Sequence, residues 1–206
     1  DPTKAAPNKV SGTTGSQVNP TAFPNVVGGQ MWQNRDNFPQ DTGLGLQGVT
    51  AYANKGGQDV VYFSGQHDFL WRYTVRDLSP GNDTWELIGR RPWSGKESSG
   101  SGSVDPAREI FVKTLTANSF GYWDVGTLAS SPENREIEIV PALPSGSPAV
   151  DFRNFGIQFD PALDAFVLWS GDAEVWLLEP PANLDPDGDG IKSEVSGWTL
   201  RRLTPS

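Results

Sequence analysis

An acidic segment near the C-terminus has the residue types and the spacing that bind a metal ion. Residues 185–191 read DPDGDGI, and a glutamate follows three residues later. Alternate carboxylates place several hard oxygens on the inside of a tight curve, and the second glycine permits the bend. The pattern matches the first seven positions of a calcium loop, in which the seventh residue contributes its carbonyl. The predicted ligands of a structural Ca²⁺ ion are Asp185, Asp187, Asp189, Ile191 and Glu194.

The match to a calcium loop ends downstream of these residues. An EF-hand has its bidentate glutamate at position 12, which is Ser196 here, whereas Glu194 stands at position 10. Glu194 reaches the ion only if the chain leaves the loop differently from an EF-hand helix, and a loop between two strands would do so. The alternative is a solvated acidic turn without an ion. In either case we expect no catalysis at this loop.

A second candidate site combines the single histidine of the chain with an acid, two arginines and a tryptophan. A tryptophan face stacks on a sugar ring, and an arginine pair binds a carboxylate or a sulfate. The alternative is that the histidine and the acid only close a hairpin and that the tryptophan packs between sheets. The predicted ligand-binding residues are His67, Asp68, Arg90, Arg91 and Trp93.

The sequence contains no motif that pairs a nucleophile or a matched acid with the histidine. The ordinary pKa of a histidine suits a general base, but a base alone does not make a catalytic site. Asp172 and Glu174 could serve glycoside hydrolysis, although such pairs occur by chance in an acidic chain. We therefore predict no catalytic residue and favour a protein that is not an enzyme.

A repeated pattern of short strands must position both candidate sites. The segment VVYFSG at 60–65 returns as FVKTLT at 111–116 and as FVLWSG at 166–171, at offsets of 51 and 55 residues. A four-strand unit that repeats at this period is typical of the blades of a β-propeller. The third strand is marked by Trp71, Tyr122 and Trp176, and the fourth by Trp85, Ile137 and Trp198.

The predicted fold class is all-β, a propeller-like arc of about three four-stranded antiparallel blades. The blades occupy about 46–89, 100–140 and 154–203, within a propeller region of 46–206. Residues 1 to about 24 are rich in Pro, Gly, Ser, Thr and Asn, and residues 1–45 are predicted to form an irregular N-terminal arm or linker that could contribute one strand. No segment has the pattern of an amphipathic helix.

Two features distinguish the blades from one another. The turns DPAR at 105–108 and DPAL at 160–163 join the first two strands of blades two and three. Blade two has Lys113 and Thr114 where its sisters have bulky residues, so it is predicted to be the degenerate copy. Blade three has eight extra residues between its third and fourth strands, which include the acidic segment.

The connectivity of such a blade predicts which loops lie together. In an up-and-down sheet of four strands, the 1–2 and 3–4 loops leave from one end, and the 2–3 and 4–1 loops leave from the other. The acidic loop is a 3–4 loop, whereas His67 lies in a 2–3 loop and Arg91 in a 4–1 loop. We therefore expect the calcium loop and the ligand-binding group on opposite faces.

The repeating unit resembles a known family. Its parts are an apolar strand, Ser-Gly at 64–65, LWRY at 70–73 and NDTW at 82–85, with counterparts at 170–171, 175–176 and 197–198. This unit resembles the kelch repeat, and more closely the kelch-like blades of galactose-oxidase-type propellers. The resemblance implies a fold and no activity, because the family spans enzymes, lectin-like modules and adaptors. The copper-radical chemistry of an oxidase is excluded, since it needs a cysteine and two histidines and this chain has no Cys and one His.

The composition limits the cellular compartments and the binding partners that are expected for the protein. The 206 residues carry a net charge of −9 and no cysteine, so nucleic acid is not expected as a partner. No stretch has the ~20 apolar residues of a transmembrane span. A start at Asp1 without an initiator Met fits removal of a signal peptide or a proteolytic cut. We expect an extracellular protein, either secreted or at the cell surface.

Known propellers close with about four to eight blades, so a longer chain, a partner or further copies would supply the rest of the disc. Three functional hypotheses follow. The first hypothesis is a secreted, non-catalytic module that presents its loops to a glycan or protein ligand. The second is part of an extracellular polysaccharide-active enzyme, a lyase or a hydrolase. The third is a self-assembling scaffold joined through open edges.

Overall fold

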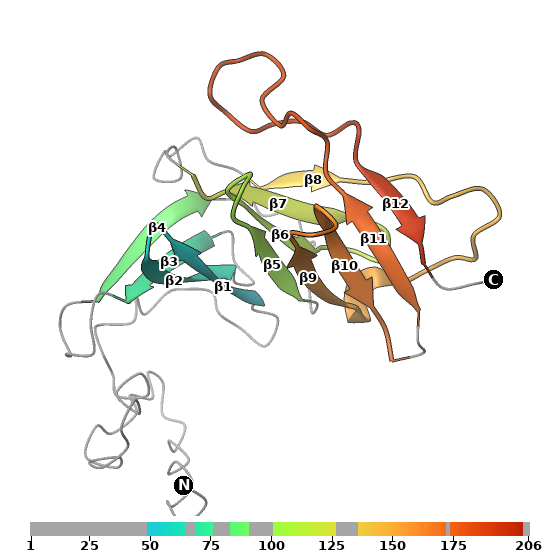
Figure 1. Cartoon of the computed structure of the whole chain (residues 1–206), viewed down its shortest axis with the longest axis horizontal. Helices are drawn as coiled ribbons and strands as arrows, with labels where there is room; N and C mark the ends of the chain where they lie inside the picture. Colours follow the sequence, from blue (N-terminus) through green and yellow to red (C-terminus); the bar gives the residue numbers. More distant parts are fainter. Residues whose placement is uncertain are drawn as a thin grey trace, which may run out of the picture.

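The protein is built from three four-stranded antiparallel sheets, which confirms the predicted all-β, propeller-like arc (Figure 1). The structure is a computed structural model, and it describes residues 49–64, 69–75, 83–90, 101–126, 136–171 and 174–203. Within these ranges the helical residues are the short 3₁₀ helix η3 (Phe152–Asn154). The described part of the chain contains no helix with the length and apolar character to cross a membrane. The predicted N-terminal arm, residues 1–45, lies outside the described residues.

Each sheet takes its four strands in chain order, so every blade is an up-and-down meander. The first sheet contains β1 (Val49–Lys55), β2 (Gln58–Ser64), β3 (Phe69–Val75) and β4 (Thr84–Arg90). The second, or middle, sheet contains β5 (Gly102–Asp105), β6 (Ile110–Thr114), β7 (Phe120–Asp124) and β8 (Ile137–Ile139). The third sheet contains β9 (Gly156–Asp160), β10 (Ala165–Trp169), β11 (Val175–Glu179) and β12 (Thr199–Arg202).

Two apolar cores hold the sheets together, one on each side of the middle sheet. Every residue of β6 and β7 is buried, because neighbouring sheets cover both faces, whereas burial alternates along β2. The first strands of successive sheets, β1, β5 and β9, are neighbours near the axis of the arc (Figure 1). The first core contains Val49, Ala51, Val60, Tyr62, Leu70, Ile88, Val104, Phe111, Trp123 and Val125. The second is built mainly from Ile110, Val112, Phe120, Tyr122, Ile139, Phe152, Phe159, Phe166, Leu168, Trp176, Leu178, Trp198 and Leu200.

The strand directions confirm the predicted distribution of the loops. Val49 pairs with Ser64, and Phe69 pairs with Arg90, so the β2–β3 connection and the segment after β4 leave the first sheet where β1 begins. We call this side of the arc the entry end. The opposite side, the turn end, carries the β1–β2, β5–β6 and β9–β10 turns. The connection from Glu179 to β12 also lies there.

The predicted equivalence of Trp71, Tyr122 and Trp176 is wrong for the middle sheet. Trp71 pairs with Phe63 and Trp176 with Leu168, but the residue that pairs with Lys113 is Gly121. Tyr122 and Trp176 lie in the same core and approach it from opposite sheets, so they cannot occupy equivalent positions. The error arose because a strand buried on both faces carries large apolar residues at successive positions, which removes the alternation that sets the register.

Lys113, which departs from the repeat, has a structural role in the middle sheet. Its side chain is 3% exposed, and its Nζ lies 2.9 Å from Oε1 of Glu136, whose side chain is 2% exposed. The same Nζ donates to Ser64 Oγ at 2.7 Å, across the interface with the first sheet. Gly121 makes room for this pair, because a Cβ at that position would lie 2.7 Å from Glu136 Oε1. The residues that break the repeat therefore form a buried polar contact between two sheets.

Candidate functional site

The acidic segment lies in the long connection between β11 and β12, which projects from the turn end (Figure 1). Carboxylate oxygens of Asp185, Asp187 and Asp189 all lie within 4.8 Å of one another. The two oxygens of Asp185 accept hydrogen bonds from Gly188 N at 3.0 Å and Gly190 N at 2.9 Å. Both glycines have positive φ, 74° and 86°, a conformation that other residues rarely adopt. The segment is thus curved, with its three acids together.

The structure brings three of the five predicted metal ligands together. Oε1 of Glu194 accepts hydrogen bonds from Ser196 N and Ser196 Oγ, both at 2.6 Å. These bonds hold the pKa of the Glu194 carboxyl below its usual value. The fourth predicted ligand, Ile191, donates its N–H to Asp189 Oδ1 at 2.8 Å. Three carboxylates are hard oxygen donors of the kind that Ca²⁺ prefers, so these three residues fit this ion.

The base of the acidic loop is fastened to the middle sheet. Lys192 Nζ lies 2.6 Å from Asp124 Oδ1, and the Tyr122 hydroxyl donates to Glu194 O at 3.0 Å. Burial raises the pKa of Tyr122, so this hydroxyl keeps its proton and remains a donor. The carbonyl of Leu184, a residue that is 5% exposed, accepts from Ser193 N and Glu194 N at 2.8 and 3.1 Å. The three acids therefore project from a fixed base.

The predicted ligand-binding group falls largely outside the described residues. His67, Asp68, Arg91 and Trp93 are not described, and Arg90 is described as the last residue of β4 without its side chain. The backbone partner of Arg90 is Phe69. The two connections that carry this group therefore leave the first sheet at the entry end, as expected, and their side chains remain a prediction.

The entry end also contains a pocket that sequence reasoning missed. The pocket has a volume of about 360 Å³ and lies where the three innermost strands β1, β5 and β9 begin. None of the described side chains that line it is titratable. The lining residues are Val49, Thr50, Ser101, Gly102, Gly156, Ile157 and Trp169.

Trp169 is the largest side chain of this pocket and is 46% exposed. It is paired with Gly156 on the neighbouring inner strand, and a Cβ on that glycine would lie 2.3 Å from Cε2 of the indole. The ring therefore extends across β9 toward the axis of the arc, over a position that only glycine permits. The sequence signal that could have revealed the pocket was Gly156 at the start of an inner strand, paired with Trp169, which directly follows the buried Leu168.

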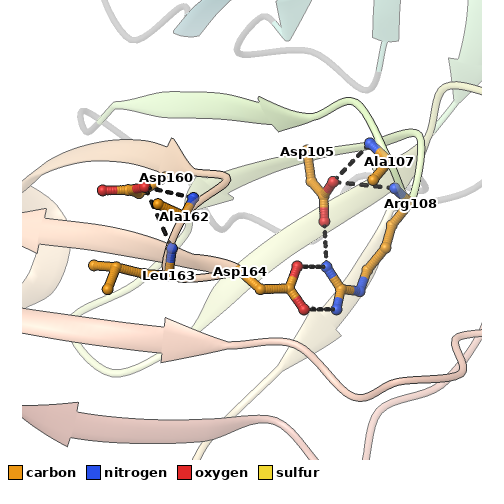
Figure 2. A network of polar contacts seen from close by, with 7 residues as sticks. All are labelled: Asp105, Ala107, Arg108, Asp160, Ala162, Leu163 and Asp164. Carbon is orange, nitrogen blue, oxygen red and sulfur yellow. Dashed lines mark hydrogen bonds and ion pairs between the residues drawn. The ribbon is translucent and has the colours of Figure 1, made fainter.

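At the turn end, an arginine joins the middle and third sheets (Figure 2). Arg108 forms a bidentate ion pair with Asp164, with Nη1–Oδ1 at 2.6 Å and Nη2–Oδ2 at 2.7 Å. Its Nη1 also contacts Oδ2 of the buried Asp105 at 2.8 Å. The hydrogen bonds from Arg108 hold the pKa of the exposed Asp164 carboxyl below its usual value.

The two turns that Arg108 connects have the same design, as their sequences predicted. Asp105 Oδ1 accepts from the backbone N–H groups two and three residues later, at 2.9 and 3.0 Å. Asp160 Oδ1 does the same at 2.8 and 3.4 Å, as Figure 2 shows. The last turn residues, Glu109 and Asp164, both have a φ of 51°. This network is a brace between sheets, since its carboxylates are occupied by the turns and the arginine.

The acidic pair considered for glycoside hydrolysis is only half described. Asp172 lies outside the described residues. Glu174 Oε1 forms an ion pair with Arg202 Nη2 at 2.8 Å, which links the β10–β11 connection to the last strand. The described carboxylate thus has a structural partner.

Comparison of the chain with protein-family models and with curated proteins finds no match. The resemblance to kelch-like propellers therefore stays a prediction from the sequence repeat, and the structure shows three four-stranded antiparallel sheets.

Proposed function

We propose that the chain is a secreted binding module of the kelch-like propeller type that takes a glycan at the entry end and uses calcium as a structural brace. The observation that carries this proposal is the pocket of about 360 Å³ at the axis, with Trp169 46% exposed beside it. An exposed aromatic ring in the lining of a pocket is a surface on which a sugar ring stacks. The hydroxyl groups of Thr50 and Ser101 lie in the same lining and supply polar partners for sugar hydroxyls.

The chemistry of the lining favours binding over catalysis. Hydrolysis and elimination need a positioned acid or base, and the described lining of this pocket consists of apolar, hydroxyl and glycine residues. The loops predicted to contain His67, Asp68, Arg91 and Trp93 leave from the same end of the first sheet. On this proposal they extend the pocket and select among glycans, with the arginines directed to acidic groups.

Calcium has a structural role in the proposal. An ion held by Asp185, Asp187 and Asp189 would neutralise acids that lie within 4.8 Å of one another and would stiffen the long connection. The loop lies at the turn end, away from the pocket, so calcium acts on stability and has no direct contact with the ligand. A loop of this kind suits the extracellular space, where millimolar Ca²⁺ fills sites with dissociation constants of about 10⁻⁴–10⁻³ M.

The proposal is tested by screening the full chain on a glycan array, with Ca²⁺ and with a chelator. We expect binding to one class of glycan, and Trp169→Ala should weaken that binding at least about tenfold, since stacking residues dominate such sites. The matched control is Leu163→Ala, because Leu163 is 50% exposed and lies at the turn end. Its binding should equal that of the native chain.

Two results would contradict the proposal. One is the absence of any glycan hit under both conditions, and the other is equal binding by the native chain and Trp169→Ala. The competing enzyme hypothesis is tested separately with a panel of neutral and uronic polysaccharides. Release of reducing or unsaturated ends from any of them would replace a binding module by a hydrolase or a lyase.

A further inference from the structure

The first sheet has an apolar face on the side away from the middle sheet. Tyr62 and Leu70 belong to the core with the middle sheet, so their neighbours Phe63 and Trp71 point the other way. Tyr52 lies on the same outer face, because it pairs with Val61, and it is 63% exposed. The outer face of the first sheet includes the exposed Tyr52 and the half-buried Val61, Phe63, Trp71 and Tyr73.

This outer face corresponds in register to a face of the third sheet that is fully packed. Phe63 pairs with Trp71 in the first sheet as Leu168 pairs with Trp176 in the third. On the adjacent first strand of each sheet, Tyr52 pairs with Val61 as Phe159 pairs with Phe166, so Tyr52 corresponds to Phe159. Phe159 is 6% exposed and Trp176 is 0% exposed, because both pack against the middle sheet.

The outer face of the third sheet, on the side away from the middle sheet, lies at the other end of the arc. It corresponds in register to the face of the middle sheet that packs against the third sheet. Val167 pairs with Leu177 there, as Val112 pairs with Tyr122 in the middle sheet. Val112 and Tyr122 are buried against the third sheet. In this apolar centre Leu177 is 1% exposed, Val167 is half-buried and Trp169 is 46% exposed, and exposed polar residues, Gln158, Thr199 and Arg201, surround it. An apolar centre with a polar rim is the usual composition of a protein interface.

We propose that a second copy of this chain docks head to tail, with its third-sheet outer face on the first-sheet outer face. The argument is continuity with an interface already present in the molecule. The two outer faces at the ends of the arc correspond, position by position, to the two faces that pack together between the middle and third sheets. Two copies would contain six sheets, which is within the four to eight that close a propeller, and closure would make two identical junctions.

The area of the two junctions is sufficient for a stable dimer. Four strands spaced about 4.8 Å apart and about six residues long present roughly 400 Å² on each face. The four faces of two junctions then cover roughly 1,600 Å², the size of a standard specific interface. The dimer and the glycan site share one side chain, because Trp169 lies on the third-sheet outer face beside Val167. Light scattering tests the dimer and the glycan array tests the pocket, so failure of one proposal is distinguishable from failure of the other.

The first test is the mass of the full chain by size-exclusion chromatography with light scattering over a range of concentrations. The expected mass is twice the chain mass of 22.3 kDa. A mass of 22.3 kDa at all concentrations would overturn the proposal. A ladder of larger species would overturn the closed ring, since open head-to-tail contacts do not stop at two.

Single substitutions on the two faces locate the junction. Tyr52→Asp should raise the dimer dissociation constant at least about tenfold, and it should leave the fold intact because Tyr52 is 63% exposed. Tyr52→Phe keeps the ring and should dimerise like the native chain. Val167→Asp should weaken the dimer as well, whereas Val140→Asp, at a residue of the middle sheet region that is 61% exposed, should not. Circular dichroism confirms that each variant is folded.

Mixing the two weakened variants distinguishes head-to-tail docking from other arrangements. A mixed dimer of Tyr52→Asp and Val167→Asp chains contains one junction with both substitutions and one junction with none. The mixture should therefore dimerise more strongly than either variant alone. No recovery on mixing, or a Val167→Asp chain that dimerises like the native one, would overturn the head-to-tail arrangement.

Discussion

The middle and third sheets each contain an ion pair, and the two pairs lie in opposite environments. In the middle sheet the ion pair of Lys113 and Glu136 has side-chain exposures of 3% and 2%. In the third sheet the pair of Arg201 and Glu179 has exposures of 57% and 36%. A buried pair is costly to break because the remaining charge has lost its water, whereas an exposed pair is screened. The comparison teaches that the centre of this arc depends on its polar contacts and that the periphery does not.

The largest expected effect is the loss of the buried cation. Lys113→Met should lower the free energy of unfolding by about 3–5 kcal/mol, since it leaves the Glu136 carboxylate in a desolvated site. The matched control is Arg201→Met in the exposed pair, which should cost less than about 1 kcal/mol. Urea denaturation of both variants measures the difference. Equal costs in the two variants would remove the distinction between centre and periphery.

A glycine contrast comes next in size. Gly121→Ala should destabilise the protein by about 1–3 kcal/mol, because its Cβ would lie 2.7 Å from Glu136 Oε1. In the β10–β11 connection, a Cβ on Gly171 would meet no described atom within 4 Å, so Gly171→Ala should change stability by less than about 0.5 kcal/mol. Thermal unfolding of the two variants checks the contrast, and a Gly121→Ala protein as stable as the native chain would contradict the packing described for Glu136.

Calcium should have a moderate effect, confined to the periphery. With a dissociation constant of about 10⁻⁴ M, 1 mM Ca²⁺ would stabilise the fold by about 1.4 kcal/mol. Asp187→Asn should abolish the rise in melting temperature on adding Ca²⁺. Glu194→Gln should keep it, because the Glu194 carboxylate binds Ser196 in this structure. A loss of the calcium response in Glu194→Gln would make that residue the fourth side-chain ligand.

The smallest effect is expected at the exposed brace of Arg108 and Asp164. The pKa of Asp164 is lowered by its hydrogen bonds from Arg108, so the contribution of the pair is complete above the ordinary carboxyl pKa near 3.9. It is lost as the pH falls through the lower, native-state pKa. NMR titration should find the Asp164 carboxyl below 3.9 in the native chain and near that value in Arg108→Ala. A native Asp164 that titrates near 3.9 would mean that the pair does not persist in solution.

Much of the architecture was predictable from short segments of sequence. The DPAR and DPAL turns have the Asp at the position where its side chain accepts the next backbone N–H groups, and the structure confirms both. The four-strand repeat and the end of the sheet from which each loop leaves were also predicted, because chain order alone sets them in a meander. The three acids of the DPDGDG segment converge as their spacing indicates.

The register of the middle sheet, the ion pair at Lys113 and the pocket beside Trp169 were decided by the tertiary structure alone. Strand type and turn chemistry depend on neighbours within a few residues, so the sequence by itself determines them. Which face of a doubly covered strand points to which sheet depends on contacts such as that between Lys113 and Ser64, 49 residues apart. A pocket formed by the first residues of three separate strands exists only when those strands meet at one axis.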